Sequence, residues 1–132
     1  MCWSNYMATP IVLKKPLRVY KVGTISSFGG FISLFQDYVY YKGQTAPTVE
    51  INPKFERCYP TEEFSNPDLC YDYFYIHKGY HSYLTKRMAK YMRNPYEKIG
   101  IFEIPAGTTI YVNYRSREVV STDIKYLGLL EE

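Results

Sequence analysis

Alternating apolar and polar positions recur in short stretches along the chain and predict strands. In LRVYKV at 17–22, the odd-numbered residues, including Lys21, share one face and the even-numbered residues share the other, which is the two-residue period of a strand. The same alternation, or a short apolar run bounded by turn residues, predicts further strands at 31–35, 38–41, 49–51, 71–77, 99–104, 109–113, 118–121 and 124–127.

One stretch has the signals of a helix instead. Thr85 is a suitable N-cap, and Leu84 and Ala89 stand at the two positions of a hydrophobic staple. Apolar and basic residues then alternate with a helical period until the Asn-Pro pair at 94–95 ends the helix. The sequence therefore predicts a helix over about 86–93 that packs on the strands.

These elements predict an α+β fold and a single domain over 1–132. We expect an antiparallel or mixed sheet of five to seven short strands with one main covering helix. Residues 1–16 are interpreted as a lead-in segment. Residues 44–70, in which proline recurs about every seven positions, are predicted to be an irregular loop that is either functional or a surface insertion.

Composition limits the class of protein. Hydrophobic residues make up 46% of the chain and charged residues 22%, which is typical of a globular domain. No apolar run is long enough to span a membrane, and the N-terminus lacks a signal-peptide pattern, so we expect a cytoplasmic location and no membrane partner. Lys and Arg are scattered at a net charge of +3, which makes nucleic acid an unexpected partner.

Cysteine and histidine do not form a metal motif. Cys2, Cys58 and Cys70 have no metal-ligand spacing and are expected to be free thiols, with a Cys58–Cys70 bridge as the alternative. His77 and His81 are four residues apart but flank a glycine in a strand-like stretch, so neither a metal nor another cofactor is predicted. Loss of Met1 would place the Cys2 thiol beside a free amine, which makes Cys2 a weak catalytic candidate; the alternative is an exposed thiol.

Tyrosine is the unusual feature of the composition, with sixteen residues against seven Phe and one Trp. A tyrosine buries its ring and keeps a polar tip. Half-buried rings could close a thin core, or they could line a groove for a planar ligand. The oligomeric state stays open.

His81 is the centre of the predicted binding site. It follows the turn at Gly79 and precedes the Thr85 cap, which would place it near the positive end of the helix, where an anion is favoured and the pKa of the imidazole is lowered. The alternative is a histidine under the sheet edge that bonds a backbone carbonyl. The predicted ligand-binding residues are Tyr20, His81, Ser82, Tyr83, Thr85, Lys86 and Arg87.

Several motifs carry a family resemblance. They are similar to segments of small uncharacterised proteins of gut Bacteroidota and their phages, several of which also begin Met-Cys. The motifs are VYKV at 19–22, GYHSYLT at 79–85, IPAGT at 104–108, YVN at 111–113 and EVVS at 118–121. The likeness covers roughly 17–128 apart from 44–70, implies a phage or bacterial origin, and assigns no activity.

A second resemblance is to the ADP-ribosyltransferase-like fold. That fold has an Arg or His on its first strand, a G-x-Y-x-T segment before a short helix, and a Glu near the last strands. Arg18, the segment at 81–85 and Glu118 occupy the corresponding positions. The resemblance implies a nucleotide-processing enzyme in which Arg18, His81 and Glu118 converge on one substrate.

The leading hypothesis for function is a small non-catalytic protein that binds a nucleotide-like anionic ligand in a Tyr-lined cleft near His81. In a phage, such a protein would sequester a host signalling nucleotide as an anti-defence measure. One alternative is the ADP-ribosyltransferase-like enzyme, with Arg18 and Glu118 as catalytic candidates. The other is a protein–protein adaptor that uses exposed tyrosines as anchors.

Overall fold

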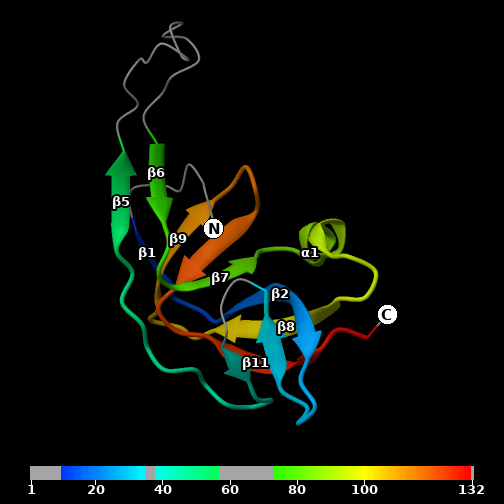
Figure 1. Ribbon diagram of the computed structural model, residues 1–132. Coiled ribbons are helices and arrows are strands. Elements are labelled where there is room, and N and C mark those ends of the chain that lie inside the picture. The colour runs from blue at the N-terminus through cyan, green and yellow to red at the C-terminus, as the bar shows by residue number, and fades with distance from the viewer. Residues whose placement is uncertain (1–9, 35–37, 57–72, 132) are drawn as a thin grey trace, which may run out of the picture.

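Strands dominate the computed structural model of the chain, which describes residues 10–34, 38–56 and 73–131 (Figure 1). The elements in order are β1 (Ile11–Val12), β2 (Leu17–Ile25), β3 (Phe31–Ser33), β4 (Val39–Tyr40), β5 (Pro53–Glu56), β6 (Tyr73–Ile76), β7 (Tyr80–Tyr83), α1 (Lys86–Met92), β8 (Lys98–Ile104), β9 (Thr109–Asn113), β10 (Glu118–Ser121) and β11 (Lys125–Leu129). Nine strands form one antiparallel sheet, and β5 and β6 form a separate two-stranded sheet.

The predicted α+β fold, with a sheet of five to seven strands and one main covering helix, is wrong, because the structure is mostly β and its large sheet has nine strands. Within the described residues, α1 is the one helix and has seven residues. Its start agrees with the prediction, since Thr85 Oγ1 accepts a hydrogen bond from Met88 N at 3.2 Å. However, α1 covers only a small apolar group that includes Val22, Tyr83 and Ile99. The larger core is covered by the sheet itself.

The sheet covers its own core because five segments close into a ring. β2 pairs with β3, and β3 pairs with β4. Just after β4, Gly43 N donates to Tyr126 O and Ala46 N to Ile124 O, both at 2.8 Å, which joins this segment to β11. β11 pairs with β8, and β8 returns to β2 over residues 17–23. Inward-facing side chains of all five segments are thereby removed from water.

The rest of the large sheet extends from the other edge of β2. Tyr20 pairs with Tyr83 of β7, and β10, β9 and β1 follow in order. The β5–β6 pair lies on the opposite side of the molecule from α1 (Figure 1). Strand pairing therefore places α1 beside the junction of β2, β7 and β8.

Aromatic side chains fill the interior of this closed ring of strands. Phe102 lies 5.4 Å from Phe31, 5.0 Å from Tyr40 and 5.0 Å from Tyr126, measured between ring centroids. These separations are typical of favourable aromatic pairs. The tyrosines divide into two groups, since Tyr40, Tyr80, Tyr83 and Tyr126 are buried whereas Tyr91, Tyr96 and Tyr114 are exposed.

Gly100 on β8 lets these rings lie flat against the strand. A Cβ at this position would lie 2.8 Å from Phe102 Cε1 and 3.0 Å from Phe31 Cε2, and both rings are fully buried. Neither ring can move aside without opening the core, because interiors are close-packed.

We therefore expect Gly100→Ala to lower the free energy of unfolding by about 1–3 kcal/mol through overpacking. Urea denaturation followed by fluorescence measures the change. Lys98→Ala, at an exposed position of the same strand, should change stability by less than about 0.5 kcal/mol. Equal stability of Gly100→Ala and the wild-type protein would contradict this account of the core.

Candidate functional site

A small polar cavity lies where β2 and β7 separate. The two strands share one register pair, Tyr20 with Tyr83, and then diverge because β2 continues against β3. The cavity has a volume of about 10 Å³ and is lined by Lys21, Val22, Ser33, His81, Ser82, Tyr83 and Glu118. That volume suits about one water molecule. A nucleotide does not fit in it.

Lys21 ties the separating strands together. Its side chain is only 3% exposed, and its Nζ donates to the backbone carbonyl of His81. Nζ also lies 5.5 Å from the centroid of the Tyr40 ring and 5.8 Å from that of Phe102, close enough for cation–π attraction. The strand alternation correctly assigned Lys21 to the face of Val19, and that face points into the core.

His81 is buried and neutral. Its ring is 7% exposed, and Nε2 lies 2.9 Å from the His77 carbonyl oxygen, so Nε2 carries the proton and Nδ1 is an acceptor. Burial, helped by the charge of Lys21, lowers the pKa of His81 to about 4 and outweighs the opposing hydrogen bond to His77. The downward direction was predicted from the helix dipole, but its main physical cause is loss of water.

Pairing of β7 with β10 sets which groups meet His81. Val120 pairs with His81 and Glu118 with Tyr83, which places His81, Tyr83 and Glu118 on one face of the sheet. Ser82 faces the other side, where its Oγ is buried without a hydrogen-bond partner in the described part of the chain. The register therefore brings together three positions that the sequence had singled out.

Arg18 does not join this group. It is exposed on β2, where it pairs in register with Glu103, and it does not line the cavity. The enzyme hypothesis requires Arg18, His81 and Glu118 to converge on one substrate, whereas only His81 and Glu118 line a common cavity. Cys2, the remaining catalytic candidate, lies outside the described residues, as do Cys58 and Cys70.

An open groove lies beside α1, near the contact between Leu84 and Arg117. Its volume is about 650 Å³, and its lining residues are Thr85, Arg87, Met88, Tyr91 and Arg117. Leu84 N donates to Arg117 O at 2.7 Å, which extends the β7–β10 pairing by one step. This bond holds the turn after β9 against the start of α1.

Arg117 has a strained backbone. Among the described residues it is the one non-glycine residue with positive φ, at 58°, a conformation that costs free energy and is common at functional sites. Asn113 Oδ1 accepts from Arg115 N at 3.0 Å and from Ser116 N at 3.3 Å, which fixes the turn that carries Arg117. Arg117 thereby lines the same groove as Arg87 and Tyr91 of α1.

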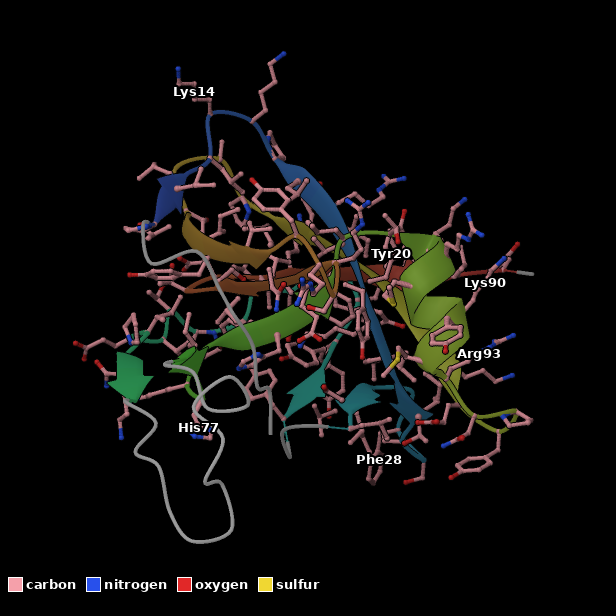
Figure 2. All side chains as sticks on the ribbon, turned by 90° about the horizontal axis from the view of Figure 1, so that it is seen from above. Lys14, Tyr20, Phe28, His77, Lys90 and Arg93 are labelled. Carbon is pink, nitrogen blue, oxygen red and sulfur yellow. The ribbon has the colours of Figure 1, made fainter. Side chains whose placement is uncertain are left out.

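The predicted ligand-binding residues thus divide between two places. Thr85 and Arg87 line the groove, whereas His81, Ser82 and Tyr83 line the small cavity. Lys86 is exposed on α1 and lines neither, and Tyr20 packs beneath α1 (Figure 2). The sequence missed Met88, Tyr91 and Arg117 as groove residues. Met88 and Tyr91 lie on the helix itself, whereas Arg117 reaches the groove only because the fold brings the turn at 114–117 to the helix.

The described residues contain no group of three or more His, Cys, Asp or Glu that could hold a metal ion. No helix in that part of the chain has both the length and the apolar character to cross a membrane.

Burial of His81 predicts that stability depends on pH. The unfolded chain binds a proton at the ordinary pKa of 6.5, but the folded ring does so only at about 4. The contribution of neutral His81 to the free energy of unfolding is therefore fully present above pH 6.5. It falls by roughly 2–3 kcal/mol as the pH drops toward 4. We expect His81→Gln to remove this part of the pH dependence in urea unfolding at pH 7 and pH 4.5.

His77→Gln serves as the matched control, because His77 is exposed and contributes its backbone carbonyl to the bond with His81. This variant should keep the pH dependence. If His81→Gln leaves the pH dependence of stability as it is in the wild-type protein, the imidazole is not the group responsible.

Comparison with known proteins adds no relative to this description. No family model matches the chain, and neither a curated protein nor a solved structure does. The resemblances drawn from the motifs at 79–85 and 104–108 therefore stay predictions, and the interpretation of the site rests on its own geometry.

Proposed function

We propose that the protein binds a nucleotide-like anionic ligand, without catalysis, in the groove beside α1. The observation that carries this proposal is that Arg87 and Arg117 line one groove together with the ring of Tyr91. The volume of about 650 Å³ falls within the range of small-molecule sites.

Each lining residue suits a part of such a ligand. A guanidinium group donates two parallel hydrogen bonds to a phosphate, and Arg87 and Arg117 supply two such groups. Tyr91 is 82% exposed and offers its face for stacking on a base. Met88 supplies a polarizable apolar surface beneath the ligand.

The same lining favours binding over catalysis. The lining contains no carboxylate, histidine or thiol that could serve as a base or nucleophile at ordinary pH. It consists of Thr85, Arg87, Met88, Tyr91 and Arg117. The Thr85 hydroxyl already accepts a hydrogen bond from Met88 N. With the resemblance to phage proteins, this supports sequestration of a signalling nucleotide as the role.

Arginine variants test the proposal. Arg87→Ala should weaken binding of a nucleotide by at least about tenfold, because a charge-assisted hydrogen bond contributes about 1.5–3 kcal/mol. Arg117→Gly should weaken binding similarly while folding is maintained, since glycine relieves the positive φ. Calorimetric titration with mononucleotides, nucleoside triphosphates and cyclic dinucleotides measures both effects.

Lys90→Ala is the matched control, because Lys90 is an exposed cation of the same helix that does not line the groove. It should leave binding of these ligands within about twofold of wild type, the change expected of a surface charge. If none of the ligands binds the folded wild-type protein, or if both arginine variants bind as well as Lys90→Ala, the proposal is wrong.

A further inference from the structure

Positive charge is concentrated around α1. Residues 86–98 and 115–118 together carry seven Lys or Arg and two acidic residues, a net charge of +5. The rest of the chain carries nine Lys or Arg and eleven acidic residues, a net charge of −2. Of the two acids, Glu97 is buried and accepts a hydrogen bond from Asn94 N at 2.7 Å. Glu118 lines the small cavity instead of the groove. The scatter seen in the sequence thus becomes one basic surface in the fold.

Exposed rings lie among these cations. Tyr91 is 82% exposed and Tyr96 is 74% exposed. The β2–β8 register ends with Gly23 paired to Lys98, the first residue of β8 after the loop that carries Tyr96. The hairpin that follows Ile25 carries Phe28, which therefore lies at the same end of the sheet as the loop after α1.

Phe28 is held in place although it is 87% exposed. Its hairpin tip is closed by hydrogen bonds from Ser26 N to Gly30 O at 2.8 Å and from Gly29 N to Ser26 O at 3.0 Å. Ser26 Oγ accepts a third from Gly30 N at 3.0 Å. Figure 2 shows Lys90 and Arg93 beside α1, Phe28 at the lower edge of the view and Lys14 at the opposite, upper end, and in Figure 1 the hairpin after β2 lies at the bottom of the molecule, below α1. The fixed hairpin holds the Phe28 ring in solvent, where a partner can contact it.

We propose that this surface binds single-stranded nucleic acid, with one nucleotide in the groove beside α1 and the adjoining nucleotides extending toward Phe28. The α1 face, as we name it, consists of Phe28, Arg87, Lys90, Tyr91, Tyr96 and Lys98. The inference rests on the proposed function, because the groove is its nucleotide subsite, and it extends the ligand class from a free nucleotide to a strand.

Two properties of the α1 face favour a single strand. Cations spaced between exposed rings match a chain in which phosphates alternate with bases, whose faces stack on aromatic side chains. In a duplex the base faces are already stacked on each other and are not available to Tyr91, Tyr96 and Phe28. An acidic protein would use the cations but would give these rings no planar partner.

Fluorescence anisotropy with a labelled thymidine oligomer of about ten nucleotides, a length within the site sizes of single-strand binders, tests the inference. The oligomer should bind wild-type protein at least about tenfold more tightly than a mononucleotide, because several phosphates and bases are held at once. Affinity should fall with salt, with a slope of about −0.7 in the logarithmic plot for each phosphate contacted.

Variants outside the groove separate the strand from the nucleotide. Phe28→Ala should weaken binding of the oligomer about tenfold, because a stacked base is lost, and should leave binding of the mononucleotide unchanged. Lys98→Ala should reduce the salt slope by about 0.7. Lys14→Ala, which removes an exposed cation at the far end of the molecule, should change neither quantity.

Failure of this inference differs from failure of the proposed function. If mononucleotides bind through Arg87 but the oligomer binds no more tightly and Phe28→Ala has no effect, the strand is excluded and the nucleotide site stands. If neither ligand binds, both proposals are wrong. Equal affinity for duplex and single strand, or binding of an acidic peptide or anionic vesicles in preference to the oligomer, would also overturn the strand proposal.

Discussion

A strand has two hydrogen-bonding edges, yet β2 has three partners, and this constraint organises the molecule. β8 occupies one edge over residues 17–23. On the other edge, β7 meets Tyr20 and β3 takes over from Gly23 onward. The exchange between Tyr20 and Gly23 leaves a gap, and Lys21 spans it by bonding the His81 carbonyl. An ammonium group inside an aromatic core costs free energy unless it is compensated, and this position provides both a carbonyl and two ring faces.

The two polar regions follow from that exchange. β3 leads into the closed ring of strands, whereas β7 leads into α1 and pairs with β10. The small cavity lies at the fork, and the groove lies where β7 ends and β10 begins. Arg87 and Arg117 are thirty positions apart in the chain, but the bond from Leu84 N to Arg117 O brings their segments together. The site residues thus depend on sheet register more than on local sequence.

Local patterns predicted most of the elements but not their assembly. The strand predicted at 49–51 is absent, and β1 and β5 lie in segments that were interpreted as a lead-in and an irregular loop. The cap at Thr85 and the alternation at 17–22 are properties of a few neighbouring residues, and both predictions agree with the structure. The covering helix was wrongly expected because a sheet normally needs another layer. Here the layer is the same sheet, closed by Gly43 and Ala46 against β11. Nothing near Gly43 in the sequence indicates a partner eighty residues away. Likewise, the positive φ of Arg117 has no sequence signal, because glycine or asparagine would be the expected residue.

The closed ring also determines when the chain can fold. Its strands come from both ends of the described sequence, since β2 pairs with β8 and the segment after β4 pairs with β11. Contacts between such distant segments form slowly, because loop-closure entropy is lost before any contact rewards it. β11 is also the last of these strands to be synthesised. Until residue 129 has left the ribosome, Phe31, Tyr40 and Phe102 have no complete enclosure, so folding of the ring follows its synthesis.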